Sequence, residues 1–411
     1  MYVSLHIVIL RRLILIAILA VLALDTTAQR LPRRRDTLGI RTYLKKPLGE
    51  IDFFSHRPDT LSLFFLGDVM SHGAMMKSAF SEYRKSHPEA RSDRHECYKY
   101  DSFFSRLQNQ IASVDVAICN MEFPLAGPPF SGYPSFSGPD SYLDYLEKTG
   151  FDVILLANNH ILDKGDAGLE RTIRVCNDLE NRTKARYTGV FSNSEDRDSR
   201  YPLIIESRGV RIAILNFTYG TNSGGKKAFP GVNRISRDEI KRAIQRAKER
   251  DCDIIIALPH WGNEYQMTHS AYQEELARFM AGEGVDLIVG AHPHVAQDIM
   301  TIKTRDKEVP VIYSLGNAVS NQNDLIARLE LSLTVKIALH RNGELEMMSP
   351  KPEFLWCTKP GTVEDSYCVV RVKEEAPRKN EWRNPSDHEK MMTTYEKVKK
   401  ATHINEEDYS N

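Results

Sequence analysis

The sequence carries no excess charge of either sign. Its 411 residues include 55 lysines and arginines and 55 aspartates and glutamates, so the formal net charge is zero. A chain without net charge has no overall field that would draw it onto nucleic acid or anionic lipid. Its obvious basic cluster, residues 30–35, lies outside the expected core. We therefore expect no nucleic-acid partner.

Cysteine is also scarce. The chain has six cysteines, and no two of them form a Cys-x-x-Cys pair, which argues against a zinc ribbon or a thioredoxin-type motif. Cys119 lies inside an apolar run and Cys252 lies beside one, where buried free thiols are common. Cys357 and Cys368 could pair if the compartment is oxidising. A metal site built from cysteine is therefore not expected.

Long apolar runs are absent except near the amino terminus. Twelve consecutive apolar residues occupy 13–24, after Arg11 and Arg12 and before small residues at 26–28. This order is typical of a secretory signal peptide. The run is shorter than the roughly 20 residues that span a bilayer, although the more polar stretch before the arginines could lengthen it into an anchor. We expect residues 1–28 to be a signal peptide or an N-terminal anchor, and the protein to be periplasmic or membrane-anchored outside the cytoplasm.

Seven apolar runs follow residue 60, and their apolar residues are nearly continuous, as in strands that are covered on both faces. Amphipathic stretches lie between several runs, and two of them begin with capping-box patterns, Ser236 with Glu239 and Ser270 with Gln273. This alternation predicts an α/β fold with a largely parallel or mixed sheet and helices on both faces. The runs are LSLFFLGD (61–68), DVAICNME (115–122), DVILLANNH (152–160), RIAILNFTYG (211–220), DIIIALPHWG (253–262), VDLIVGAHPH (285–294) and PVIYSLGN (310–317).

Polar side chains close these runs. Ligands of open α/β sheets bind outside the carboxyl ends of the strands, so we expect the closing residues to converge on one rim. Oxygen and imidazole donors without thiolates suit manganese, iron or zinc. The closing residues are Asp68, Asn120, Glu122, Asn158, Asn159, His160, Asn216, His260, His292, His294 and Asn317.

Taken singly, several of these residues also have a structural interpretation that needs no ligand. Asp68 could cap a helix or close a turn, Asn159 could form an Asx-turn, and His260 could be a packed histidine. His292 and His294 would share one side of an extended chain, because residues i and i+2 of a strand face the same way. Residues 158–160 can act together only if the chain turns there. An unpaired buried Glu122 would be costly, and taken jointly the residues favour a cation site.

Six motifs stand out along the sequence. They are GDVM (67–70), NMEFPL (120–125), LANNHILDKG (156–165), HWGNEY (260–265), GAHPH (290–294) and YSLGN (313–317). These motifs resemble those of the capsule-synthesis CapA (PgsA) family of poly-gamma-glutamate biosynthesis, within the calcineurin-like metallophosphatase superfamily. The resemblance covers about residues 61–345, with the motifs in the family's order.

The resemblance implies a four-layer metallophosphatase-like fold with two central mixed sheets between helices, and a centre that holds one or two divalent ions. His160 would donate a proton to a leaving group or contact substrate, and Asp163 would orient its ring. The implied metal ligands are Asp68, Glu122, Asn159, His260, His292 and His294.

The chain departs from the superfamily pattern at three places. Met70 stands where the superfamily has a histidine, and His72 lies two residues further on. Glu122 stands in place of the bridging aspartate, and Ile161 replaces the acidic residue after the histidine of the Asn-His motif. Asp163 is then the nearest substitute for that acid.

Two functions follow from this pattern. The first is a metal-dependent hydrolase of a phosphoester or related bond in capsule or exopolymer biosynthesis. The alternative is a non-catalytic component that binds an anionic polymer, within a membrane-bound synthesis complex. The segment 127–140, rich in glycine, proline and aromatic residues, is equally an active-site loop or a surface turn. Lys226 and Lys227 are expected to be solvated.

The expected organisation has four parts. Residues 1–28 are the targeting segment and 29–60 a linker, and residues 61–345 form the CapA-like domain. Residues 346–411 are a C-terminal extension with a charged tail, in which 389–401 could form a short helix.

Overall fold

The structure is a computed structural model that describes residues 59–225 and 227–409. The chain divides into two units, and the larger is Thr60–Ala338 with Met347–Asn411. The smaller unit contains residues 1–59 and 339–346. The expected targeting segment, and the expected linker except for its last two residues, lie outside the described residues. Among the described residues, no helix is both long and apolar enough to cross a membrane.

One or two α-helices alternate with one to three strands as far as residue 289, and the eight strands between residues 287 and 371 follow one another without an α-helix between them. The helices are α3 (Gly73–Arg84), α4 (Gln108–Ser113), α5 (Asp140–Thr149), α6 (Gly165–Arg182), α7 (Ser194–Arg200), α8 (Arg237–Glu249), α9 (Ala271–Glu283), α10 (Val372–Glu375) and α11 (Pro385–Thr402). The strands are β1 (Asp59–Val69), β2 (Val116–Met121), β3 (Val153–Leu155), β4 (Arg186–Thr188), β5 (Val190–Phe191), β6 (Leu203–Ser207), β7 (Val210–Thr218), β8 (Gly231–Val232), β9 (Ile254–His260), β10 (Leu287–Val289), β11 (Ile299–Lys303), β12 (Glu308–Ile312), β13 (Asn317–Val319), β14 (Leu329–Leu339), β15 (Leu345–Met347), β16 (Lys351–Thr358) and β17 (Cys368–Arg371).

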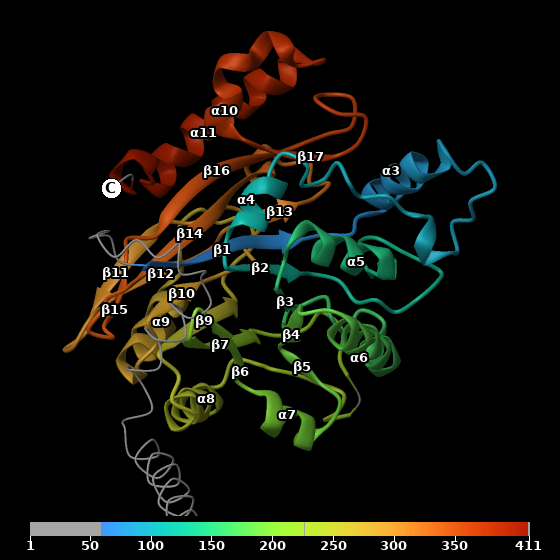
Figure 1. The fold of residues 1–411 in the computed structure, drawn as a ribbon. Coiled ribbons are helices and arrows are strands. Elements are labelled where there is room, and N and C mark those ends of the chain that lie inside the picture. Colours follow the sequence, from blue (N-terminus) through green and yellow to red (C-terminus); the bar gives the residue numbers. More distant parts are fainter. Residues whose placement is uncertain (1–58, 226, 410–411) are drawn as a thin grey trace, which may run out of the picture. The chain divides into compact units, whose positions relative to one another are not determined.

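The described strands build two large mixed sheets and one small antiparallel sheet, β5-β8. The first runs β17-β16-β14-β1-β2-β3-β4, with β13 beside β1, and the second runs β11-β12-β10-β9-β7-β6. Strands β1 to β4 are parallel, whereas β14, β16 and β17 pair antiparallel. One hydrophobic cluster joins the first sheet to α3–α6, and another joins the second sheet to α8 and α9. The predicted α/β fold, a four-layer sandwich with two central mixed sheets flanked by helices, is confirmed (Figure 1).

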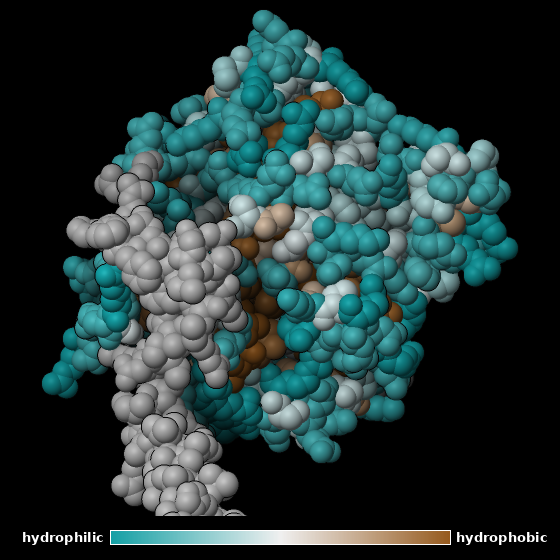
Figure 2. Space-filling model, viewed as in Figure 1, coloured by the Kyte–Doolittle hydropathy of each residue, from teal (hydrophilic) through white to brown (hydrophobic). Residues whose placement is uncertain are grey.

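The apolar runs are buried as predicted. All seven residues of β9 and all six of β2 are buried. On the face seen in Figure 2 most of the surface is hydrophilic, and hydrophobic residues show mainly in its middle. Ser270 and Gln273 form the complete predicted capping box of α9. Ser236 caps α8 through the backbone of Glu239, but the side chain of Glu239 binds arginines instead of closing the box.

One predicted strand is in fact two. The run 310–317 splits into β12, in the second sheet, and β13, which pairs with β1 of the first sheet. The chain therefore crosses between the sheets at 313–316, where Asp68 N donates to Gly316 O (3.0 Å). A Cβ added at Gly67 would lie 1.9 Å from that same oxygen, so only glycine allows this close approach. The crossing brings Asn317 opposite Asp68.

The C-terminal residues 347–409 are part of the same unit as the rest of the sheet. Strands β16 and β17 extend the first sheet, and α11 contains the short helix predicted at 389–401. The buried side chain of Asp387 on α11 receives two hydrogen bonds from Arg328 (2.9 and 2.7 Å). Cys357 and Cys368 are free. Cys357 is opposite Val369 and Thr358 is opposite Cys368, so the two thiols lie on opposite faces of the sheet and do not pair.

We expect Gly67→Ala to lower the free energy of unfolding by about 1–3 kcal/mol, because the new methyl group would overlap the carbonyl oxygen of Gly316. Denaturant unfolding followed by circular dichroism measures this. Gly282→Ala is the matched control, because nothing lies within 4 Å of a Cβ at Gly282. Equal stability of the two variants would show that the crossing is not tightly constrained.

Candidate metal centre

The two carboxylates of the site come from neighbouring strands. Asp68 lies near the end of β1, and Glu122 directly follows β2, held by a hydrogen bond from its N to Val69 O (3.0 Å). Both side chains are 0% exposed. Asn120 Nδ2 donates to Asp68 Oδ1 (2.7 Å), so one carboxylate oxygen of Asp68 already has a neutral partner.

His260 and Asn159 approach these carboxylates from the other sheet and from a turn. His260 is the last residue of β9, and its Nε2 lies 2.8 Å from Asn159 Oδ1 and 3.6 Å from Glu122 Oε1. Its Nδ1 lies 3.8 Å from Asp68 Oδ1. The chain turns after β3, where Asn158 N donates to Leu156 O (3.0 Å). This turn is the condition under which residues 158–160 can act together.

His292 and His294 follow β10, but the chain there is not extended. Their φ angles are 100° and 60°, in the left-handed region, so the prediction that they face the same way along a strand is wrong. The loop bends instead, and the backbone N of His292 donates to Asp68 Oδ2 (3.1 Å). His294 Nδ1 lies 3.6 Å from Asp68 Oδ2, 3.9 Å from Glu122 Oε2 and 2.9 Å from Asn317 Oδ1. Two strained residues around one proline are typical of a functional loop.

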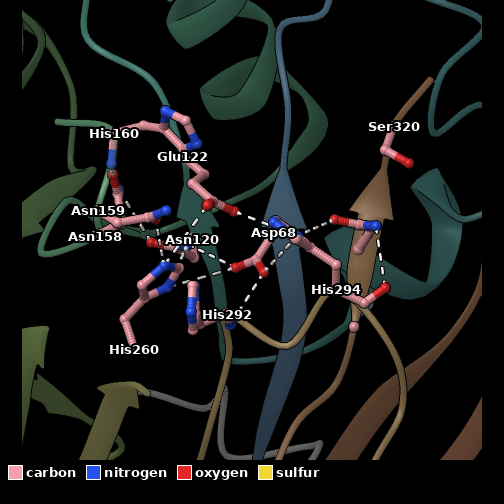
Figure 3. Close-up of polar contacts among 12 residues, drawn as sticks. Asp68, Asn120, Glu122, Asn158, Asn159, His160, His260, His292, His294 and Ser320 are labelled. Carbon is pink, nitrogen blue, oxygen red and sulfur yellow. Dashed lines mark hydrogen bonds and ion pairs between the residues drawn. The ribbon is translucent and has the colours of Figure 1, made fainter. Parts of the chain in front are cut away.

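These side chains form two clusters that share one residue (Figure 3). The first is Glu122, His260 and His292, and the second is Asp68, Glu122 and His294; within each, the candidate ligand atoms lie within 4.8 Å of one another. Glu122 belongs to both, which is the place of a bridging carboxylate between two ions. Asn159 lies against the first cluster through His260. The structure thus brings together all six predicted ligands, and ligation itself stays a prediction.

The donor set fits a divalent cation. Three buried atoms of the site have no hydrogen-bond partner among the described residues. They are both carboxylate oxygens of Glu122 and Nδ1 of His292. Burial and the nearby Glu122 raise the pKa of Asp68 to about 7, and burial raises the pKa of Glu122. Burial lowers the pKa of His260 to about 3. Burial opposes charge on His294, but Glu122 and Asp68 outweigh it and raise its pKa. One imidazolium cannot balance two buried carboxylates, and a cation would supply the remaining charge.

His160 and Asp163 form a pair beside the clusters. His160 Nδ1 lies 2.8 Å from Asp163 Oδ2, as predicted for an orienting carboxylate. Burial opposes charge on His160, but the hydrogen bond with Asp163 and the charge of Glu122 outweigh it and raise the pKa of the ring. Phe136 N donates to Asp163 Oδ2 (2.8 Å), and the Phe136 ring meets the His160 ring edge-on at 4.7 Å. The segment 127–140 therefore lies at the site, which favours its active-site interpretation.

Two residues singled out in the sequence lie elsewhere. Asn216 is buried, but it accepts from Ala157 N (2.8 Å) and donates to Leu258 O (2.9 Å), so it holds loops together and does not join the rim. His72 belongs to neither cluster and lines an adjacent cavity of about 730 Å³. It does not replace the histidine for which Met70 stands.

Sequence reasoning missed two contacts. Asn317 was placed at the rim but was given no role, although it lies 2.9 Å from His294 Nδ1. Asn222 Nδ2 lies 3.3 Å from His160 Nε2 and lines the cavity. Asn222 follows the apolar run 211–220, so extending the search by two residues past each run would have found it.

The two sheets and their shared carboxylate–histidine clusters define an α/β protein with a candidate two-ion centre. Residues 62–322 match the family model described as "Bacterial capsule synthesis protein PGA_cap", and the chain belongs to this family. This confirms the resemblance to the CapA family.

Two curated relatives share parts of the chain. It is 30% identical over 276 residues to "Capsule biosynthesis protein CapA" of Bacillus anthracis, covering 62% of this chain and 64% of that protein. It is 33% identical over 201 residues to "PGA biosynthesis protein CapA" of Bacillus subtilis (strain 168), covering 48% and 50%. The match therefore spans about half to two thirds of the length of these relatives.

Solved structures with a similar arrangement include two nucleotidases. The NAD nucleotidase NadN of Haemophilus influenzae has a TM-score of 0.43 at 13% identity, over 82% of this chain and 62% of that one. The 5'-nucleotidase precursor of Thermus thermophilus has a TM-score of 0.40 at 14% identity, over 84% and 59%.

We expect the wild type to bind about two divalent ions per chain, and His292→Ala or His294→Ala to bind about one, because each removes a ligand of a different cluster. Glu122→Gln should bind fewer than either, since Glu122 belongs to both clusters. Elemental analysis after dialysis measures the content. His95→Ala, an exposed histidine next to Glu96, is the control. A wild type that holds no ion after incubation with manganese, iron or zinc would contradict this.

Proposed function

We propose that this chain is a metal-dependent hydrolase of capsule or exopolymer biosynthesis outside the cytoplasm, which cleaves a phosphoester or related bond. The single observation that carries the proposal is the pair of buried clusters sharing Glu122, placed beside the His160–Asp163 pair at one cavity. Membership in a capsule-synthesis family supports the biological setting. The substrate would be an anionic polymer of the poly-gamma-glutamate type or a phosphoester intermediate of its assembly.

The proposed ligands are Asp68, Glu122, Asn159, His260, His292 and His294. Bound divalent ions of the manganese, iron or zinc kind would lower the pKa of a coordinated water and neutralise the oxygens of the reacting group. Asn120 and the backbone N of His292 keep the Asp68 carboxylate in place through two hydrogen bonds. These two hydrogen bonds orient the carboxylate of Asp68 within the second cluster.

His160 is the proposed proton donor to the leaving group. Asp163 Oδ2 accepts from its Nδ1, which leaves Nε2 to face the cavity near Asn222. Phe136 fixes the other side of this arrangement, because its N donates to the same oxygen of Asp163. The Phe136 ring and the carboxylate of Asp163 together fix the orientation of the His160 ring. Its Nε2 therefore points in one direction, as proton transfer requires.

We expect His160→Ala to lower kcat by about 10²- to 10⁴-fold, as loss of a general acid does. Asp163→Asn should lower kcat by about 10- to 100-fold, because the His160 ring loses the charge that orients it. Both variants should keep the wild-type metal content. The assay uses metal-loaded protein with chromogenic phosphomonoesters, phosphodiesters and gamma-glutamyl oligomers, and the exposed-residue variant His95→Ala as control.

Binding of a gamma-glutamyl oligomer without turnover of any of these compounds would favour the second candidate, a non-catalytic polymer-binding component of an envelope complex. Met70 is the observation that favours it, because this buried residue lines the cavity where the superfamily has a histidine. A metal-loaded protein that neither hydrolyses these compounds nor binds a gamma-glutamyl oligomer would contradict both candidate functions.

The proposed location outside the cytoplasm rests on the sequence of the first 28 residues alone. We expect residues 1–60 fused to a reporter that is active only after export to give activity, and Leu19→Arg to abolish it, because a charge interrupts the apolar segment. Immunoblotting of the fusion distinguishes a cleaved signal peptide from a retained anchor. A silent wild-type fusion at normal expression would contradict the location.

A further inference from the structure

The cavity beside the candidate metal centre has a histidine on its wall that the proposed reaction does not use. His72 and His160 both line it, and the ring of Phe136 contacts both edge-on, at 5.5 Å and 4.7 Å between centroids. Phe136 therefore lies against both rings and fixes their spacing. His72 belongs to neither cluster of candidate ligands.

The hydrogen bond to His72 fixes which ring nitrogen carries the proton. The backbone N of Asn321 donates to His72 Nδ1 (3.2 Å). A backbone N–H can only donate, so Nδ1 must be the bare acceptor nitrogen, and the proton of the neutral ring is on Nε2. Among the described residues, Nε2 of His72 has no hydrogen-bond partner. His72 therefore offers a neutral N–H donor with no partner of its own.

Asn321 is itself held by the C-terminal part of the chain. Its Oδ1 accepts from Lys359 Nζ (2.7 Å) and from the Tyr367 hydroxyl (2.5 Å). Lys359 Nζ also lies 5.7 Å from the centre of the Tyr367 ring. Both donors lie beyond residue 322, where the match to the family model ends. Residues outside the family-matched segment thus determine how His72 is held.

The charges of the cavity lining indicate what this donor can bind. The described lining residues include Glu264 and Asp324 and the amides Asn222, Gln322 and Asn323, but no lysine or arginine. Apart from the candidate metal centre and His160, whose pKa is raised, a polyanion therefore finds no compensating side-chain charge among the described lining residues. A neutral N–H donor in such a lining suits an acceptor oxygen of a group that is bound at that centre.

We propose that His72 is a ligand-binding residue whose Nε2–H donates to an acceptor oxygen of the substrate, and that Asn321, Lys359 and Tyr367 are positioning residues for it. This deepens the proposed function, on which it rests for the location of the substrate. The ligand class is an oxyanion or ester whose other oxygens face the metal centre. Inorganic phosphate is the simplest probe of that chemistry.

Nuclear magnetic resonance of the full chain labelled with 15N-histidine tests the tautomer. His72 should show a bare Nδ1 and a protonated Nε2, assigned by loss of the signals in His72→Ala, and phosphate should shift the Nε2 signal. Tyr367→Phe should shift the Nδ1 signal without changing metal content. Tyr272→Phe, an exposed tyrosine at 52%, should not. A protonated Nδ1, or an Nε2 signal that phosphate does not move, overturns the proposal.

The affinity of His72 variants for phosphate tests whether the His72 side chain itself contributes to binding. His72→Ala should weaken binding about three- to tenfold, the value of one hydrogen bond. His72→Gln places an amide N–H near the position of Nε2 and should retain most of the affinity, whereas His72→Asn mimics Nδ1 and should not. Equal affinities of wild type, His72→Ala and His72→Asn would overturn the role.

The two proposals fail in different ways. Metal binding and hydrolysis without any response of His72 to phosphate would leave the proposed function standing and remove this one. A phosphate response of His72 in a chain that binds no metal would remove the proposed function and leave His72 as a donor to the bound oxyanion. Metal content is therefore measured on every variant before affinity.

Discussion

The site depends on one constraint, the burial of Asp68 and Glu122 side by side with neither side chain exposed. Two carboxylates cannot both be charged in such a place without a positive partner. Burial lowers the pKa of His260 to about 3 and that of His292 well below its ordinary value, so these two imidazoles do not supply that partner. Burial opposes charge on His294, but Glu122 and Asp68 outweigh it and raise its pKa, and one imidazolium balances only one of the two carboxylates. Among the described residues, Glu122 has no hydrogen-bond donor for either oxygen. A divalent cation is the partner that satisfies all of these groups together, which is why the site favours metal chemistry.

The crossing of the chain between the sheets makes this burial possible. Residues 313–316 leave the second sheet after β12 and enter the first at β13, next to β1. At this crossing Gly316 O accepts a hydrogen bond from Asp68 N, and Asn317 Oδ1 lies within hydrogen-bond distance of His294 Nδ1. Carboxylates from one sheet and His260 from the other thereby meet at one point. Gly67 is the residue that the crossing demands, because any side chain there would overlap Gly316.

Much of this arrangement could be predicted from the sequence, because the rule that carboxyl ends of strands meet at one edge needs only strand positions. Asp68, Glu122 and His260 came from that rule. His292 and His294 lie at the site as predicted, but the extended backbone assumed for them is wrong, because their φ angles are positive. The hydrogen bond from His292 N to Asp68 Oδ2 joins residues 224 positions apart, and no local pattern encodes such a contact. The split of run 310–317 was missed for the same reason: an apolar run does not show which sheet each half joins.

Asn216 and His72 show the other limit of sequence reasoning. Both residues were judged by their place in the chain, but hydrogen bonds with distant backbone atoms decide their roles. Asn216 receives one from Ala157, 59 residues away, and becomes a link between loops. His72 receives one from Asn321, 249 residues away, and becomes a donor that faces the cavity. Spacing in the sequence carries no information on contacts at such separations.

The candidate centre and the cavity wall are supplied by different parts of the chain. Every candidate ligand lies within residues 62–322, which match the capsule-synthesis family model. Lys359 and Tyr367, which hold Asn321, lie on the segment that extends the first sheet beyond that match. Because Arg328 binds Asp387 through two buried hydrogen bonds, this segment is fixed to the core and not merely attached to it. Changes in the C-terminal strands can therefore alter what the cavity accepts while the carboxylates and imidazoles that would hold metal stay in place.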